Sequence, residues 1–343
     1  MIVSCQGLEL SEGLLRVSKA ISNKIANPIL EGIKIIAEED TLIMSATDTE
    51  LTIEKKIKAE VRQEGETVVP GRFITEFVKK LTNTQIELEV NDKNQLTIKY
   101  EDSESVIQCY NPVEYPGFKN VESKEYFGIS QKDFKTCVNK SIFAVALDDS
   151  RPILKGVLFD INNNELNVVA LDGYRLARVK KTIKSNMTKS IVVPARSLNE
   201  LSKMIEDSDE IINIYVGEYT IMADLGDTKV TSRLLEGDYI NYKQIIPVNF
   251  ETFVIVNKEQ FEQALERATL LSRASSSNYV KFDIKESNLC ITSNSELGNL
   301  KENIPVSVSG KDLIISFNPR YYLESLRVNT NEFVKLCFNN PST

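Results

Sequence analysis

The chain has 343 residues, of which 42% are hydrophobic and 26% charged, with a formal net charge of −8 and no histidine. This composition is ordinary for a globular protein, and no run of 18 apolar residues occurs that would predict a membrane-spanning helix. Without histidine, Ser-His and Cys-His nucleophile arrangements are excluded and the commonest zinc ligand is missing.

Motifs for phosphate binding and metal binding are missing as well. No two of the five cysteines have metal-ligand spacing, and neither Gly-x-x-x-x-Gly-Lys nor Gly-x-Gly-x-x-Gly occurs. The paired carboxylates Asp148/Asp149 and Asp207/Asp209 are compatible with acid–base work or Mg²⁺ binding, but solvated loop charges are the simpler interpretation. We therefore expect a non-enzyme without cofactor or metal, and an enzyme that uses carboxylates or lysine is the alternative.

The predicted elements alternate between helices and strands along the chain. In chain order they are a helix at 10–22, a helix at 72–82, strands at 86–90 and 95–100, a helix at 130–144, a strand at 167–170, and helices at 196–206, 257–271 and 320–327. The helix at 257–271 is the clearest, because Asn257 and Gln260 have capping-box spacing and Phe261, Ala264, Leu265 and Ala268 form one apolar face.

One unit is used three times. Arg-x-x-x-Glu recurs at intervals of 124 residues, as Arg72 with Glu76, Arg196 with Glu200, and Arg320 with Glu324. Asn-Pro-Ile-Leu-Glu-Gly at 27–32 returns as Arg-Pro-Ile-Leu-Lys-Gly at 151–156, and Ala-Thr-Asp at 46–48 returns as Ala-Leu-Asp at 170–172. This repeat predicts an α+β fold of three domains, 1–124, 125–248 and 249–343, each with two helices on one face of antiparallel sheets.

The order and spacing of three motifs resemble a known family. They are Asn-Pro-Ile-Leu at 27–30, Leu-Asp-Gly-Tyr-Arg-Leu at 171–176, and Gly-Asp-Tyr-x-x-Tyr before Ile-Ile-Pro at 237–247. With the triplicated unit, they are similar to the landmarks of bacterial sliding clamps, the beta subunits of DNA polymerase III. The resemblance implies a head-to-tail homodimer that forms a ring of six domains, with helices lining the hole and sheets outside.

The partners follow from the same resemblance. It implies a processivity factor that encircles double-stranded DNA without sequence readout and tethers the DNA polymerase III catalytic subunit, the clamp loader and other proteins with clamp-binding motifs. The five scattered cysteines are typical of reduced thiols and favour a cytoplasmic protein. A different three-domain scaffold protein with the same fold and no ring is the alternative.

A sliding ring needs cations for phosphates but no contacts to bases. The negative net charge alone argues against nucleic acid as a partner. Binding of nucleic acid depends, however, on the local electrostatic field at the binding face and not on the total charge. Lys24 and Arg151 match family positions near DNA, and the other DNA-facing candidates lie on or beside predicted helices: Arg72, Lys79, Lys80 and Lys203. An exposed helix charge is the alternative for each, and for the Arg-x-x-x-Glu arginines a structural salt bridge is the favoured interpretation.

The second copy departs from the others at 171–176, where a hairpin-turn signal, Asp172-Gly173, is followed by Tyr and Arg that a turn does not require. By resemblance, this segment borders a hydrophobic pocket for short peptides. The matching positions are Leu154, Leu171, Gly173, Tyr174, Arg175, Leu176, Ile240, Gln244 and Ile245, with Asn318, Tyr321, Pro341 and Thr343 from the third copy. Ile240 and Gln244 depart from the Pro and Arg usual in the family, and Tyr174 stands where the best-known members have His, so we expect an altered preference for peptide charge.

The dimer contact would join the first domain of one chain to the third domain of the next. Val106 and Ile107 on a predicted edge strand, with Leu270 and Leu271 at the end of the 257–271 helix, are the expected interface, and core packing is the alternative. The third copy also looks shorter. Its strand at 334–340 matches 86–92, and the counterpart of 95–117 is missing, so we expect a C-terminally truncated third domain.

Overall fold

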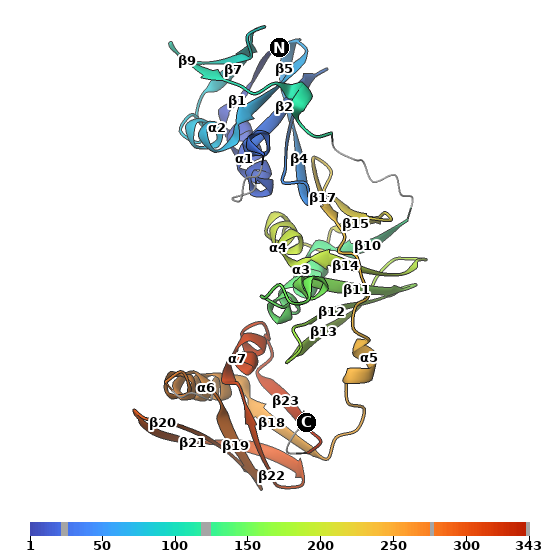
Figure 1. The fold of residues 1–343 in the computed structure, drawn as a ribbon, viewed down its shortest axis with the longest axis vertical. Coiled ribbons are helices and arrows are strands. Elements are labelled where there is room, and N and C mark those ends of the chain that lie inside the picture. Colours follow the sequence, from blue (N-terminus) through green and yellow to red (C-terminus); the bar gives the residue numbers. More distant parts are fainter. Residues whose placement is uncertain (22–26, 118–124, 275–277, 341–343) are drawn as a thin grey trace. The chain divides into compact units, whose positions relative to one another are not determined.

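The computed structural model describes residues 1–21, 27–117, 125–274 and 278–340 (Figure 1). They form two compact units. The first unit contains Met1–Asp172 and Arg178–Asp238, which hold the first and second copies of the repeat, and the second contains Gly173–Ala177 with Tyr239–Thr343. No helix in these described ranges combines the length and apolarity needed to cross a membrane.

The first copy alternates strands and helices in the expected way. Its elements are β1 (Ile2–Gln6), α1 (Gly7–Val17), β2 (Gly32–Glu38), β3 (Thr41–Thr47), β4 (Leu51–Lys58), β5 (Glu60–Gln63), β6 (Gly65–Pro70), α2 (Gly71–Val78), β7 (Gln85–Val90), β8 (Gln95–Tyr100) and β9 (Ser103–Gln108). Pro70 lies at the entrance of α2, where a missing N–H has no cost.

The second copy repeats this order. Its elements are β10 (Tyr126–Ser130), α3 (Gln131–Asn139), β11 (Gly156–Asn162), β12 (Glu165–Leu171), β13 (Leu176–Thr182), β14 (Thr188–Pro194), α4 (Ala195–Met204), β15 (Ile211–Val216), β16 (Thr220–Asp224) and β17 (Thr228–Arg233). A short helix, α5 (Tyr242–Ile245), follows it in the chain.

The third copy forms the larger part of the second unit. Its elements are β18 (Thr252–Asn257), α6 (Lys258–Ser272), β19 (Val280–Lys285), β20 (Asn288–Ser295), β21 (Gly298–Gly310), β22 (Leu313–Phe317), α7 (Pro319–Arg327) and β23 (Phe333–Phe338). The strand expected at 334–340 is β23, which pairs with β18.

All strand pairs are antiparallel, and helices pack in pairs beside the sheets. The strand orders are β5-β1-β7-β8-β9, β10-β15-β16-β17-β4-β3-β2-β6, β13-β12-β11-β14 and β22-β19-β20-β21-β18-β23. Within each copy the two helices contact each other, as α1 with α2, α3 with α4, and α6 with α7. The fold is therefore α+β, as the repeat predicts.

The predicted apolar face of α6 is the core of the third copy. Phe261, Ala264, Leu265 and Ala268 are all at most 1% exposed and pack with strand residues in one cluster. Complete burial of a side chain such as Phe261 contributes about 2 to 3 kcal/mol. Asn257 caps the helix as expected, since its side-chain oxygen accepts a hydrogen bond from the Gln260 N–H at 3.1 Å.

Several predicted helix boundaries are wrong by a few residues. The first helix begins at Gly7 and not at residue 10, because β1 passes directly into it. Only glycine fits there, since an added Cβ would lie 2.0 Å from the Leu81 carbonyl oxygen. The helix predicted at 130–144 ends at Asn139, after which the Ser141 hydroxyl donates to the Cys137 carbonyl at 2.7 Å and competes with helix continuation.

The five cysteines are unpaired, and four of them are buried, as their scattered positions predict. Burial raises the pKa of Cys5 and of Cys137 to about 12, because an apolar environment disfavours the thiolate. Cys337 is only partly buried.

Candidate functional site

The first and second copies are joined edge to edge by two strands. β17 lies antiparallel beside β4, with Val230 opposite Ile53 and Ser232 opposite Leu51. This pairing merges strands from both copies into one eight-stranded sheet (Figure 1). The backbone groups on both facing edges are therefore satisfied, which makes this a closed joint between two domains.

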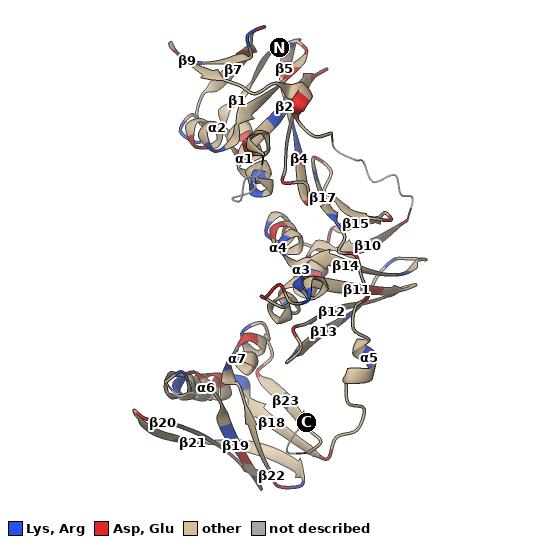
Figure 2. Ribbon diagram, in the orientation of Figure 1, with Lys and Arg blue, Asp and Glu red and all other residues tan. Residues whose placement is uncertain are grey.

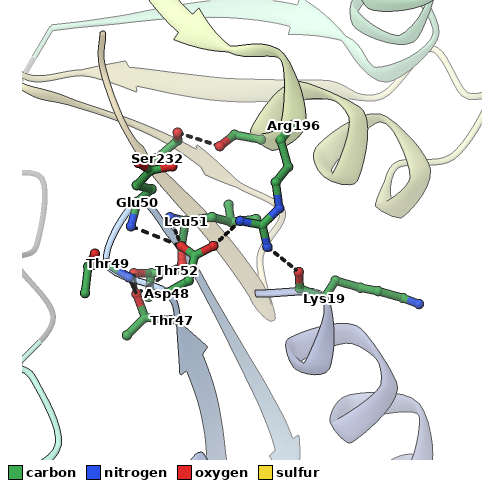
Figure 3. A network of polar contacts seen from close by, with 10 residues as sticks. Lys19, Thr47, Asp48, Thr49, Glu50, Leu51, Thr52, Arg196 and Ser232 are labelled. Atoms are coloured by element: carbon green, nitrogen blue, oxygen red, sulfur yellow. Dashed lines mark hydrogen bonds and ion pairs between the residues drawn. The ribbon is translucent and has the colours of Figure 1, made fainter. Parts of the chain in front are cut away.

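An ion pair crosses the same joint (Figure 3). Arg196 on α4 donates from Nη1 to Oδ2 of Asp48 and from Nη2 to the Lys19 carbonyl oxygen at 3.5 Å. The other carboxylate oxygen of Asp48 accepts from the N–H groups of Glu50 at 3.0 Å and Leu51 at 2.8 Å. Because the Asp48 side chain is only 6% exposed, it depends on these partners for the hydrogen bonds that water would otherwise supply.

Further polar contacts lie beside it. Lys55 on β4 forms a salt bridge of 2.5 Å with Asp227, whose backbone oxygen accepts from the Lys56 N–H at 2.8 Å. The Arg233 N–H donates to the Glu50 carbonyl at 2.8 Å. The joint thus combines a strand ladder with two ion pairs between the first and second copies.

The repeated Arg-x-x-x-Glu motif has different partners in different copies. Arg320 pairs with Glu324 in its own helix at 2.7 Å, as the spacing predicts. In the second copy this prediction is wrong, because Arg196 binds the buried carboxylate of Asp48 and Glu200 pairs with Lys203 at 3.0 Å. The Asp48 carboxylate is desolvated and held in place by backbone N–H groups, which makes it a strong partner for a guanidinium.

Besides β13, which ends the order β13-β12-β11-β14, two other strand edges correspond to the joined ones and have no strand beside them in the described parts of the chain. β9 pairs with β8 and ends the five-stranded sheet, as β17 would end its own sheet without β4. The first part of β21, Gly298–Pro305, pairs with β20 only, and the strand meets β18 from Val306 onward. β21 follows β20 as β4 follows β3, so the two edges are counterparts of β17 and β4.

The residues predicted for the dimer interface lie on or near these edges. Val106 on β9 is 59% exposed and Leu270 on α6 is 70% exposed, which does not fit the alternative of core packing. Ile107 and Leu271 are half-buried.

The candidate DNA-facing cations are exposed. Arg72 lies on α2, Lys79 and Lys80 follow it directly, and Lys203 lies on α4. Figure 2 shows Lys and Arg on the helices of each copy, together with acidic residues. Arg151 is exposed just before the turn Pro152–Lys155, and Lys24 lies outside the described residues.

Within the second unit, Arg175 binds the third copy. Its Nη1 donates to Oε2 of Glu324, and its guanidinium carbon lies 4.6 Å from the centroid of the Tyr321 ring. Burial opposes ionisation of Glu324, but the hydrogen bonds from Arg320 and Arg175 outweigh it and keep the pKa of this carboxyl below its ordinary value. Arg175 and Arg320 therefore bind the two oxygens of one carboxylate.

The remaining residues of the expected peptide pocket differ in exposure. Tyr174 is 85% exposed beside Gly173, whose φ of 95° suits glycine, whereas Leu154 and Leu171 are both 2% exposed. On the second unit, Leu176, Ile240 and Tyr321 are half-buried, Gln244 is exposed, Ile245 is 51% exposed, and the Asn318 side chain accepts from the Arg320 N–H at 3.1 Å. Pro341 and Thr343 lie outside the described residues.

Sequence reasoning missed Asp48 as the partner of Arg196, and it missed β21 as the open counterpart of β4. The recurrence of Asp48 at Asp172 was a usable signal, since a short Asp in a repeated turn suggests a structural acceptor. The edge of β21 had no signal of its own, because pairing depends on the whole sheet.

Comparisons with known proteins agree along the whole chain. Family models of the DNA polymerase III beta subunit match at residues 1–119 for the N-terminal domain, 128–241 for the central domain and 243–343 for the C-terminal domain. The beta sliding clamp of Bacillus subtilis is 33% identical over 342 residues, covering 96% of this chain and 90% of that protein. That of Staphylococcus epidermidis is 34% identical over 331 residues, covering 93% and 88%.

Solved structures give the same result. The crystal structure of the DNA polymerase sliding clamp from Bacillus subtilis has a TM-score of 0.96 at 32% identity and covers 99% of this chain and 93% of that one. The DNA polymerase III beta subunit from Thermotoga maritima has a TM-score of 0.92 at 27% identity, covering 100% and 94%.

Proposed function

Because the chain belongs to the DNA polymerase III beta subunit family, the bacterial sliding clamps, we propose that two copies close head to tail into a ring of six domains around duplex DNA. Sliding clamps are non-catalytic processivity factors of DNA replication, so function here is binding and tethering. Ring closure is the step on which both depend.

The observation that carries the proposal is the joint between the first and second copies. Repeated domains that join head to tail use corresponding edges, so we take the β17–β4 pairing as the template for the joint between chains. Its counterparts are β9 of one chain and β21 of the partner.

The strand registers transfer directly. Gln108 of β9 lies opposite Gln95 of β8, and Arg233 of β17 lies opposite Thr220 of β16 in the same way, so β9 aligns with β17. Asn299 of β21 lies opposite Asn294 of β20, and Thr52 of β4 lies opposite Thr47 of β3 in the same way, so β21 aligns with β4. The observed pair of Thr231 with Thr52 then becomes Val106 with the partner's Asn299, and the pair of Ser232 with Leu51 becomes Ile107 with the partner's Gly298.

The exposed side chains suit a joint between separate chains. Val106 and Ile107 stand where β17 has Thr231 and Ser232, and Phe73, which is 51% exposed, stands where α4 has Ser197. Two free chains lose translational and rotational entropy when they associate. Burial of apolar surface contributes a favourable free energy of about 25 cal/mol per Å², which offsets that loss. Leu270 and Leu271 on α6 would add to the same surface.

Phosphate contacts from the helices would hold the DNA. We assign Lys24, Arg72, Lys79, Lys80, Arg151 and Lys203 to this role, because their charges give affinity without reading bases and so leave the ring free to slide. Arg72 corresponds to Arg196 and would lie at the joint between chains. An ion pair across that joint is therefore the alternative to a phosphate contact for Arg72.

The tether would be a hydrophobic pocket for short peptides. Leu154, Leu171, Tyr174, Leu176, Ile240 and Ile245 would receive apolar side chains from flexible tails of the polymerase catalytic subunit, the clamp loader and other partners. Gly173, Arg175, Gln244, Asn318, Tyr321, Pro341 and Thr343 would complete it. Five thiols without disulfides favour the cytoplasm as the compartment.

Loading onto DNA tests the proposal. With a clamp loader, the protein should stay on closed circular DNA and leave after the circle is cut, since only the ends release a ring. Equal retention on circular and linear DNA would rule out encirclement.

A further inference from the structure

The joint within the chain contains a row of alternating charges. Asp224 on β16 lies opposite Lys229 on β17, and Lys229 lies opposite Glu54 on β4. All three side chains are half-buried. Opposite charges on directly opposed residues stabilise an antiparallel pair, so this row supports the pairing of β17 with β4.

The first copy carries a second row, which stops at an edge. Glu87 on β7 lies opposite Lys99 on β8, and Lys99 lies opposite Glu104 on β9. The Lys99 ammonium is 3.1 Å from Glu87 and 2.6 Å from Glu89, and these bonds raise its pKa, that to Glu89 most. Glu104 is exposed on the outermost strand, so the row ends in a negative charge.

When the β17–β4 register is applied to β9 and the partner's β21, a cation lies opposite the terminal negative charge of this row. Since Lys229 opposes Glu54 in the template, Glu104 would oppose the partner's Lys301. Lys301 is exposed on β21 and has Thr292 opposite it on β20, so it meets no charge on that side. The row would continue as Glu87, Lys99, Glu104 and the partner's Lys301.

We propose that Glu104 and Lys301 form a charge code that directs β9 to the β21 of a second copy of this chain, with polarity opposite to that of Lys229 and Glu54. This inference rests on the ring proposed above and names the residues that select its joint. In the chain the cation is on β17 and the anion on β4, whereas between chains the anion is on β9 and the cation on β21.

The inverted polarity disfavours the wrong pairings. β9 beside a β4 edge would bring Glu104 against Glu54, and β17 beside a β21 edge would bring Lys229 against Lys301. Directly opposed like charges destabilise a strand pair. Among the four edges β17, β4, β9 and β21, these charges favour the two correct joints over the two exchanged ones.

Charge reversal with mixing tests the code. Glu104→Lys and Lys301→Glu are purified separately and mixed, and the dimer dissociation constant is measured by sedimentation velocity. Each variant alone has like charges at both joints of its ring, so we expect its dissociation constant to rise by about 10- to 30-fold. An equimolar mixture forms a ring in which both joints have opposite charges, so its dissociation constant should return to within about fivefold of the wild type, the remainder reflecting the new lysine opposite Lys99 in its own chain.

Asp92→Lys is the matched control, because Asp92 is exposed on the turn at the other end of β8 and its substitution changes the net charge by the same amount as Glu104→Lys. The effects should shrink in 1 M salt, where the Debye length is about 3 Å. The code would be wrong, and the ring would remain, if Glu104→Lys and Asp92→Lys raised the dimer dissociation constant equally. The same conclusion would follow if mixing Glu104→Lys with Lys301→Glu did not lower the dissociation constant. A wild type that stays monomeric would overturn both.

Discussion

Arg196 binds Asp48, which lies 148 positions earlier in another copy of the repeat, although Glu200 is four positions away on its own helix. In the second copy this arginine therefore holds the second domain to the first. In the third copy the same position, Arg320, shares Glu324 with Arg175. A single motif thus supports contacts that differ from copy to copy.

Asp48→Ala should destabilise the chain by about 1 to 3 kcal/mol, because it leaves the Arg196 guanidinium and two backbone N–H groups without their acceptor. Chemical denaturation followed by circular dichroism measures this change. Glu200→Ala removes a single pair with Lys203, whose side chain is 60% exposed, and is the control, with an expected change below about 1 kcal/mol. Equal effects of the two substitutions would contradict a special role for the joint.

Glu324 should make stability dependent on pH. Its pKa is lowered in the folded chain, so its ionised form stabilises the fold above the ordinary carboxyl pKa of 4.5, and this contribution disappears as the pH falls through the lower folded value. The melting temperature of Glu324→Gln should therefore be below that of the wild type at pH 7, and the difference should narrow below about pH 4. A difference that stays constant from pH 7 to pH 3 would argue against an ionised Glu324.

Tyr174→Ala combined with Leu176→Ala should abolish binding of a hydrophobic polymerase-tail peptide, with a rise of at least about 30-fold in its dissociation constant. Calorimetry or fluorescence anisotropy measures this binding, and sedimentation should show an unchanged dimer. Tyr219→Ala is the control, since Tyr219 is also exposed, at 54%, but lies outside the proposed pocket. Unchanged peptide affinity in the double variant would exclude this pocket.

Lys79→Ala with Lys80→Ala should weaken DNA binding in a salt-dependent way. Loss of two phosphate contacts should lower the slope of log affinity against log salt by about 1.8, without any change in sequence preference. The control is Lys56→Ala with Lys58→Ala, which removes two exposed cations from strand β4. If both pairs lower the slope equally, the helices are not the DNA-facing side.

The sequence predicted the elements that depend on local pattern. The apolar face of α6, its Asn257 cap and the edge position of Val106 follow from residue spacing and strand position, and all are present. The boundaries at residues 124 and 248 and the roles of the assigned site residues stay predictions. The choice of Asp48 by Arg196 was out of reach, because it depends on β17 reaching β4 and so on contacts between copies.

The central claim is that two chains close into a ring through joints like the β17–β4 pairing. Electron microscopy of the purified protein tests it most directly, because it shows whether the particles are rings. Particles at micromolar concentration should be closed rings with a central hole and six similar lobes from two chains. Compact monomers, or open chains of domains without a hole, would contradict the account.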